Sequence, residues 1–255
     1  MKSLIRKVSR AFGIDIVKYY PTPIERARAI PSNQKGAGFI KMLTFHEIDL
    51  VLDVGANVGQ FAGELFEKGY QGKVVSFEPL SSAYNQLVEK SKSKSNWVVA
   101  ERCAIGEEQG EIEINISNNS ESSSILPILK THVDAASNSV YVDSEKVKIF
   151  KLYDLADHYV EQSQSTLLKI DTQGYEDNVL KGAKEIIPKI KGIHLELSLV
   201  PLYEGQVLFE DMLREIKSMG FSLYNLYPGF WDYRTGRLLQ VMGTFFREEQ
   251  QSSKL

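Results

Sequence analysis

The stretch from Asp49 to Pro79, DLVLDVGANVGQFAGELFEKGYQGKVVSFEP, decides the fold of this chain. It opens with an apolar run over 50–54 that is typical of a buried parallel strand, and a small-residue turn follows over 55–59. A helical pattern and a second apolar run over 74–77 come next. The order strand, turn, helix, strand predicts a nucleotide-type fold whose ligand lies beyond the carboxyl ends of the strands.

The two strands end on acids, Asp53 and Glu78, and this indicates which ligand is bound. A dinucleotide site calls for G-x-G-x-x-G, but Asn57 stands between Gly55 and Gly59 in place of the middle glycine. We expect Asp53 to point into the ligand space, where a carboxylate repels a pyrophosphate but suits the ammonium and sulfonium of S-adenosylmethionine. Glu78 could accept both ribose hydroxyls. The alternative is another nucleotide fold, with both acids at solvated strand ends.

Length and composition predict one large α/β domain with a normal core. The chain has 255 residues, of which 43% are hydrophobic and 25% charged. Its net charge of -3 gives no drive toward nucleic acid, so no nucleic-acid partner is expected. The single cysteine fits a reducing cytoplasm. We see neither a secretory signal nor an apolar run long enough to span a bilayer.

The domain organisation predicted from these patterns has three parts. Residues 1–38 form an N-terminal helical extension, 39–247 the catalytic domain with an insertion over about 107–152, and 248–255 a flexible tail. The first 20 residues read as an amphipathic helix. That helix could rest on an anionic membrane surface, at the inner face of the membrane, or pack on the domain or on a second subunit of a homodimer.

The remaining chain alternates between strand and helix patterns. Further strands are expected over 97–100, 110–117, 147–152, 166–171, 193–197, 221–227 and 241–246, with helices over 39–47, 81–90 and 209–219 and another containing Val179, Leu180 and Ala183. The polar stretch 118–124 is either a flexible loop or a source of hydroxyls and amides for a polyhydroxylated acceptor. The aromatic stretch 224–233 could stack on a sugar ring, plug the core or form a dimer surface.

Two acids at strand ends are the candidate catalytic residues. Asp171 and Glu196 follow or end the apolar runs that should become the fourth and fifth strands, where both would face a reacting oxygen. Asp171 could be a general base, a ligand of a divalent cation such as Mg²⁺ together with Glu196, or a helix cap. Glu176 could hydrogen-bond within the following turn or orient Asp171.

Two histidines and the single cysteine are further candidate site residues. His132 lies in the insertion, where it could accept the proton of the acceptor hydroxyl or simply be a solvated loop residue. His194 alternates with Glu196 along a strand and is expected to be packed and hydrogen-bonded. Cys103 and Ala104 follow the third strand and should flank the adenine. No activating partner is evident for Cys103, so a pocket or core role is favoured over a nucleophile.

Several of these motifs together resemble the FkbM-type S-adenosylmethionine-dependent methyltransferases. The matching segments are LDVGANVGQF at 52–61, GY at 69–70, SFEPL at 76–80, Trp97, AIG at 104–106, SSSIL at 122–126, LKIDTQGYE at 168–176, LELS at 195–198 and PLYEG at 201–205. They cover roughly residues 39–247. The resemblance implies a Rossmann-like sheet of seven strands, mostly parallel with the last strand antiparallel, flanked by helices. It also places Phe61 and Pro79 beside the cofactor.

The function implied by the resemblance is methyl transfer to a hydroxyl of a sugar, glycan, glycolipid or secondary metabolite. Two positions depart from the family pattern: Met242 and Gln173 stand where acids are common, so a catalytic carboxylate at either position is not expected. Two other functions stay open from the sequence. One is an NAD-dependent oxidoreductase, which the missing middle glycine disfavours, and the other is a cofactor-binding protein of the same fold without methyl transfer.

Overall fold

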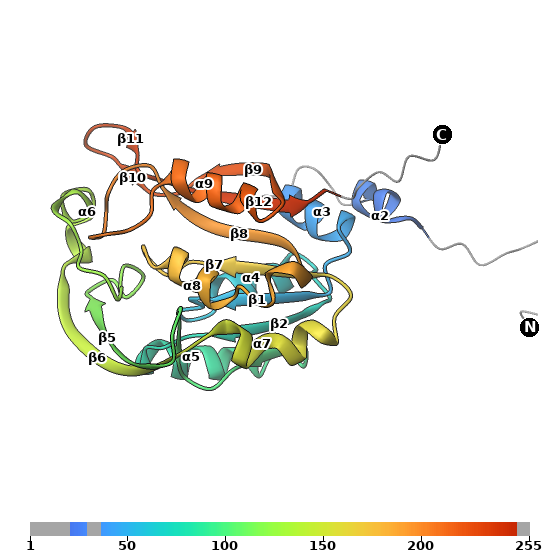
Figure 1. Ribbon diagram of the computed structural model, residues 1–255, viewed down its shortest axis with the longest axis horizontal. Helices are drawn as coiled ribbons and strands as arrows, with labels where there is room; N and C mark the ends of the chain where they lie inside the picture. The colour runs from blue at the N-terminus through green and yellow to red at the C-terminus, as the bar shows by residue number, and fades with distance from the viewer. Residues whose placement is uncertain (1–20, 30–36, 249–255) are drawn as a thin grey trace, which may run out of the picture. The chain divides into compact units, whose positions relative to one another are not determined.

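The structure is a computed structural model that describes residues 21–29 and 37–248 (Figure 1). The chain divides into two compact units, Met1–Phe45 and His46–Leu255. The first unit contains α2 (Pro23–Ala29) and α3 (Ala37–Phe45), which contact each other. The helix predicted over the first 20 residues, its membrane contact and most of the predicted tail lie outside the described residues. No described helix combines the length and apolar character needed to cross a membrane.

A seven-stranded sheet forms the centre of the second unit, in the order β3-β2-β1-β7-β8-β12-β9 (Figure 1). Its strands are β1 (Leu50–Val54), β2 (Lys73–Phe77), β3 (Trp97–Val99), β7 (Thr166–Ile170), β8 (Ile190–Ser198), β9 (Phe221–Pro228) and β12 (Gln240–Arg247). The first five pair in parallel, whereas β12 runs antiparallel to both of its neighbours. The prediction of a mostly parallel seven-stranded sheet with an antiparallel last strand is confirmed.

The apolar runs of the sequence become the buried layers of this unit. Every residue of β1 and β7 is buried, as expected of central parallel strands covered on both faces. Flanking helices are α4 (Gln60–Glu67), α5 (Ser81–Ser91), α7 (Leu152–Glu161), α8 (Glu176–Gly182) and α9 (Phe209–Ser218). In α4 the buried residues Ala62, Leu65 and Phe66 recur at helical spacing and form the inward face. The sequence patterns did not predict α7.

The insertion forms a separate three-stranded sheet together with β4, which precedes it, in the order β4-β6-β5. Its strands are β4 (Ala104–Ile105), β5 (Gly110–Ser117) and β6 (Tyr141–Phe150). Strands β5 and β6 lie side by side in Figure 1. The alternating pattern placed β5 correctly, but β6 begins earlier than expected. The segment between them holds the unpredicted helix α6 (Lys130–Ala135) and one 3-10 turn, Ser137–Ser139. A short hairpin, β10 (Trp231–Asp232) and β11 (Arg237–Leu238), lies where a loop was expected.

A row of polar residues crosses the buried sheet from β2 to β12. Ser76, Asp53, Lys169, His194 and Thr244 are successive register partners on five neighbouring strands. The Ser76 hydroxyl donates to Asp53 Oδ2 over 3.1 Å, Lys169 Nζ lies 2.9 Å from Asp53 Oδ1, and His194 Nδ1 lies 2.8 Å from Thr244 Oγ1. All five residues are buried, so the sheet carries a polar line through its apolar core.

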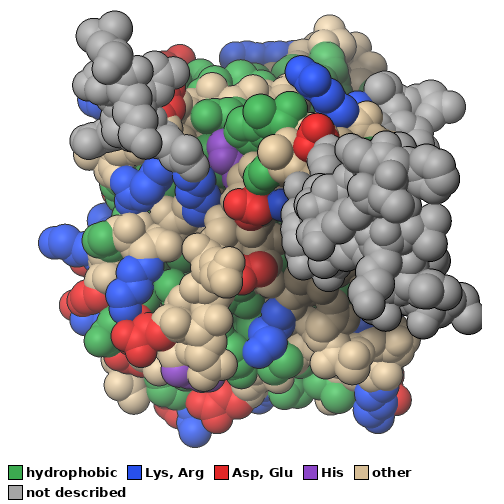
Figure 2. Space-filling view, turned by 90° about the vertical axis from the view of Figure 1, so that its right-hand side faces the viewer, with side chains coloured by type: hydrophobic (Ala, Val, Ile, Leu, Met, Phe, Trp, Pro, Cys, Tyr) green, Lys and Arg blue, Asp and Glu red, His purple; other side chains and the backbone are tan. Residues whose placement is uncertain are grey.

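Figure 2 shows the face of the molecule that is turned away from β5 and β6. Basic and acidic side chains are interspersed on this face, and hydrophobic side chains gather in one small patch. No single sign of charge dominates the described part of this face.

Candidate active site

Most of the predicted site residues surround one cavity of about 380 Å³. Its walls come from the turn after β1, the end of β2, the segment around β4, the loop after β5, the end of β7 with the turn that follows, and β8. The predicted residues that line it are Gly55, Asn57, Phe61, Glu78, Pro79, Cys103, Ala104, Asp171 and Glu196. Strand ends that are far apart in the sequence thus meet at one place.

Gly55 forms the tightest point of this wall. Its backbone is left-handed, with φ of 73°, and a Cβ there would lie only 1.9 Å from the backbone oxygen of Asp171. Its N–H donates to the Phe77 carbonyl over 3.1 Å. The turn after β1 therefore fits closely between the ends of β2 and β7, which only glycine allows.

Replacing Gly55 with alanine is expected to lower the free energy of unfolding by about 2–5 kcal/mol, because the left-handed backbone and the steric clash both oppose a side chain. Gly236 is a matched control, since it has the same φ of 73° but a Cβ added there would meet nothing within 4 Å. Gly236→Ala should cost about 1 kcal/mol, from backbone strain alone. Urea denaturation of both variants measures the difference. Equal losses would show that the contact with Asp171 is unimportant.

Glu78 lies at the end of β2 and is 5% exposed. One carboxylate oxygen accepts the Asn57 N–H over 2.8 Å, and the other accepts the Leu80 N–H over 2.9 Å. Burial raises the pKa of Glu78 to about 7, although these two hydrogen bonds oppose the rise. Because each carboxylate oxygen offers two acceptor sites, each keeps one for a hydroxyl in the cavity.

Two of the residues predicted to bind the cofactor do not line the cavity. Asp53 is fully buried, because Lys169 and Ser76 hold its carboxylate inside the sheet, and this corrects the expectation that it points into the ligand space. Gly59 instead begins α4 with a φ of 78°, and a Cβ there would lie 2.7 Å from the Trp97 ring. Gly59 therefore serves the packing of the helix.

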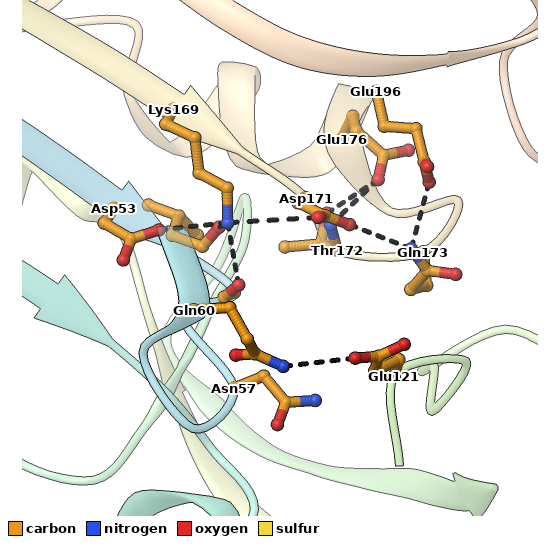
Figure 3. A network of polar contacts seen from close by, with 12 residues as sticks. Asp53, Asn57, Gln60, Glu121, Lys169, Asp171, Thr172, Gln173, Glu176 and Glu196 are labelled. Atoms are coloured by element: carbon orange, nitrogen blue, oxygen red, sulfur yellow. Dashed lines mark hydrogen bonds and ion pairs between the residues drawn. The ribbon is translucent and has the colours of Figure 1, made fainter. Parts of the chain in front are cut away.

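Lys169 is a cavity residue that the sequence analysis missed. Besides the ion pair with Asp53, its Nζ donates to the Gly55 carbonyl over 2.9 Å and lies 4.0 Å from Asp171 Oδ2 (Figure 3). These acids raise the pKa of Lys169 although burial lowers it. A lysine inside the apolar run 166–170 was a usable signal, because a buried ammonium needs an acidic partner.

The turn after β7 brings three carboxyl groups together (Figure 3). Gln173 Nε2 donates to Asp171 Oδ1 over 2.8 Å and to Glu196 Oε2 over 2.9 Å. Burial, followed by the charges of Asp171 and Glu176, raises the pKa of Glu196 well above its usual value. Asp171 is the more exposed acid, with 35% of its side chain accessible. A buried acid with a raised pKa thus lies beside a more exposed acid.

Glu176 has a role within this turn. Its carboxylate accepts the N–H groups of Thr172 over 2.9 Å and Gly174 over 3.1 Å, which supports the first of the two alternatives considered for it. It is 6% exposed, and burial raises its pKa to about 7. The carboxylate thereby fixes the backbone that follows Asp171.

The pair Asp171 and Glu196 does not fit a divalent cation as it is arranged here. Gln173 presents N–H groups to both carboxylates, and such donors repel a cation in the same place. Among the described residues no group of three or more His, Cys, Asp or Glu could hold a metal ion. We therefore derive no catalytic step through Mg²⁺.

His132 is neither a cavity residue nor a solvated loop residue, which corrects the expectation that it reaches the acceptor. It lies in α6 and is 3% exposed, with its ring packed 5.2 Å from that of Tyr203 and 5.0 Å from that of Phe230. Burial lowers its pKa to about 4. The histidine is therefore neutral at physiological pH, and it is not part of the cavity lining.

The other two candidates, His194 and Cys103, are both buried, as their sequence patterns predicted. His194 is buried beside Thr244, and burial together with the charge of Lys169 lowers its pKa to about 3. Cys103 is fully buried in the cavity wall, and burial raises the pKa of its thiol to about 12. A thiol with this pKa is no nucleophile at neutral pH.

The polar loop after β5 supplies one wall of the cavity. Ser120, Glu121, Ser123 and Ser124 line it, and Gln60 Nε2 donates to Glu121 over 3.2 Å (Figure 3). The aromatic stretch 224–233 contributes no residue to the cavity lining. Tyr233 is instead 86% exposed at the hairpin between β10 and β11.

The chain matches one known protein family over most of its length. The family described as "Methyltransferase FkbM domain" matches residues 53–223. None of the curated proteins compared with the chain matches it. Among solved structures, methyltransferase FkbM from Methylobacillus flagellatus KT is 14% identical, with a TM-score of 0.48 over 96% of this chain and 70% of that chain.

A second similar structure is the magnesium protoporphyrin IX methyltransferase from Synechocystis PCC 6803, which has bound S-adenosylmethionine. It is 11% identical, with a TM-score of 0.46 over 97% of each chain. The family match spans the turn after β1, the insertion and the acidic turn after β7, so it covers nearly the whole cavity lining. The chain belongs to the FkbM family of methyltransferases.

Proposed function

We propose that this chain transfers a methyl group from S-adenosylmethionine to a hydroxyl oxygen of a sugar or a similar polyhydroxylated acceptor. The observation that carries the proposal is a buried carboxylate at the end of β2, Glu78, facing the same cavity as the partly exposed carboxylate of Asp171. The first is suited to binding a ribose, and the second is suited to taking a proton from a hydroxyl.

The residues of the cavity fit S-adenosylmethionine. Glu78 keeps one free acceptor site on each oxygen for the ribose hydroxyls. Gly55 lets a ligand approach the backbone closely. Ala104, Ile105 and Ile114 provide an apolar wall for a flat base. When bound, the cofactor supplies an electrophilic methyl group.

The chain's own contribution to catalysis is orientation and proton removal. Asp171 is the most exposed acid of the cluster and accepts the hydroxyl proton as the oxygen attacks. Glu196 is held by Gln173 and also accepts the Gln240 amide over 2.6 Å, which fixes it beside the reacting group. The proton ends on the Asp171 carboxyl and leaves to solvent.

The charges of the cavity favour a neutral hydroxyl acceptor. Its described lining contains the acids Glu78, Glu121, Asp171 and Glu196 but one basic residue, Lys169, whose Nζ is already paired with Asp53. No described basic group in this lining is left to bind a phosphate. Serine hydroxyls from the loop after β5 could instead bind the hydroxyls of a sugar.

Calorimetric titration of the full chain tests the cofactor. We expect S-adenosylmethionine to bind with a micromolar Kd and NAD not to bind. Glu78→Ala should weaken binding about 100-fold or more, because two charge-assisted hydrogen bonds are lost. Binding of NAD alone would support the oxidoreductase alternative. Cofactor binding without turnover of any acceptor would support a non-catalytic protein.

The Kd for S-adenosylmethionine measured in this titration should depend on pH. Because the pKa of Glu78 is raised to about 7, its carboxylate is fully formed only above that pH, and we expect the affinity to fall as the pH is lowered from 8 to 6. Below the pKa of Glu78, the affinity for S-adenosylmethionine should fall by about tenfold per pH unit. Glu78→Gln should bind weakly with little pH dependence. A wild-type affinity that is flat over this range would contradict the assignment.

An acceptor screen with isotopically labelled S-adenosylmethionine tests the second half of the proposal. The panel should pair neutral sugars with their phosphorylated forms. Turnover of neutral members is expected, whereas a consistent preference for phosphorylated members would contradict the charge argument.

A further inference from the structure

Among the described residues, Gln173 is the one whose side chain hydrogen-bonds both Asp171 and Glu196. Its backbone is left-handed, with φ of 55°, and its side chain turns back over the cavity. The two N–H groups of its amide are divided between Asp171 and Glu196, at 2.8 and 2.9 Å (Figure 3). One amide therefore joins the carboxylates of two neighbouring strands.

The orientation of this amide is fixed by its surroundings. Its oxygen accepts the hydroxyl of the fully buried Tyr203 over 2.8 Å, and its backbone carbonyl accepts the Ser124 hydroxyl over 2.7 Å. Reversing the amide would turn its oxygen toward two acids and its N–H groups toward the Tyr203 hydroxyl, so both N–H···O bonds to the acids would be lost. The donor side must face the acids.

The electrostatic effect of the amide follows from this orientation. The titratable groups facing Asp171 are Lys169 on β7, Glu196 on β8, Glu176 at the start of α8, and Tyr203 in the loop after β8. Two of these four are acids that oppose ionisation of Asp171. An N–H donor favours the ionised form of a carboxylate without adding charge.

We infer that Gln173 is a positioning residue that aims the Asp171 carboxylate into the cavity and favours its ionised form. The inference deepens the proposed function, because it rests on Asp171 as the group that takes the hydroxyl proton. An ionised glutamate, although the resemblance makes an acid common at this position in the family, would not supply the two N–H donors. A further carboxyl between Asp171 and Glu196 would bring a shared proton, and that proton would occupy the oxygen needed for catalysis.

Carboxyl titration by NMR tests the inference without an acceptor. The full chain is labelled with ¹³C at the Asp and Glu carboxyls, and the Asp171 and Glu196 signals are assigned with Asp171→Asn and Glu196→Gln. We expect Gln173→Glu to raise the titration midpoint of Asp171 by about one pH unit or more. Gln173→Met removes the donor without adding charge and should raise the midpoint by less.

Gln86→Glu is the matched control, because Gln86 is exposed on α5, where the same change adds an acid away from the cavity. It should leave the Asp171 midpoint unchanged. If Gln173→Glu does not fold, Gln173→Met and Tyr203→Phe still test the inference, because the first removes the amide and the second removes the hydroxyl that holds it. An unchanged Asp171 midpoint in the folded Gln173 variants would overturn the inference.

A kinetic readout separates this inference from the proposed function. With an acceptor from the screen, the acid limb of the pH profile of kcat/KM should move upward in Gln173→Glu by the same amount as the NMR midpoint, while the Kd for S-adenosylmethionine stays within about threefold of wild type. Absence of cofactor binding in the wild-type protein would defeat the proposed function. An unmoved acid limb with normal cofactor binding would defeat only the role of Gln173.

Discussion

Lys169→Met should lower the free energy of unfolding by about 3–5 kcal/mol, because it leaves the carboxylate of Asp53 buried without its cation. Asp53 is 0% exposed, and the only other side chain that bonds it among the described residues is Ser76. Methionine fills a similar volume, so little of the loss would come from an empty space. Urea denaturation monitored by circular dichroism measures it.

Two further variants show whether the charge is the cause. Asp53→Asn combined with Lys169→Met removes both charges and should recover most of the lost stability. Lys184→Met is the control for removing a lysine, since Lys184 is exposed in the turn that follows α8. This variant should change the free energy of unfolding by less than about 0.5 kcal/mol. If the double variant were as unstable as Lys169→Met alone, the ion pair would not explain the loss.

Asp171→Asn should reduce the rate of methyl transfer about 10²–10⁴-fold, while the Kd for S-adenosylmethionine changes by less than about threefold. Asparagine keeps the shape of the side chain and can still accept the Gln173 N–H through its oxygen, but it cannot take a proton from the acceptor. Single-turnover measurements with labelled cofactor separate the rate of the chemical step from binding.

A matched variant outside the cavity completes this experiment. Asp177 lies six residues away on α8 and forms an ion pair with Lys181 at 2.8 Å, outside the cavity lining. Asp177→Asn should leave turnover within about twofold of wild type. A loss of cofactor affinity in Asp171→Asn as large as the loss of rate would assign Asp171 to cofactor binding and leave the identity of the base to Glu196.

The repeating apolar runs explain how much of the fold could be predicted. The stretch 49–79 contains strands β1 and β2 and the helix between them, and the parallel order of the strands follows from such units. Helix α7 was missed although its buried residues Leu152, Ala156 and Val160 are spaced at four-residue intervals. That spacing is as regular as in the predicted helices, so the sequence does carry a signal for α7.

The candidate site was harder to predict because side-chain direction depends on the neighbouring strand. Asp53 and Glu78 both end strands, yet one is paired inside the sheet and the other faces the cavity. The difference comes from Lys169, which lies opposite Asp53 only once β1 and β7 have paired. His132 was misplaced for the same reason, since nothing local shows that Tyr203 and Phe230 enclose it.

The polar row across the sheet also bears on how the chain reaches its native state. Its five members come from strands that are distant in sequence, and their partners match only when all five strands pair in the native register. A slip of one residue would turn Lys169 to the other face, and the apolar Leu168 or Ile170 would stand opposite Asp53. A misaligned sheet would then enclose unpaired charges, and this makes it less stable than the sheet in its native register. The buried polar row thus restricts stable pairing of these five strands to one register.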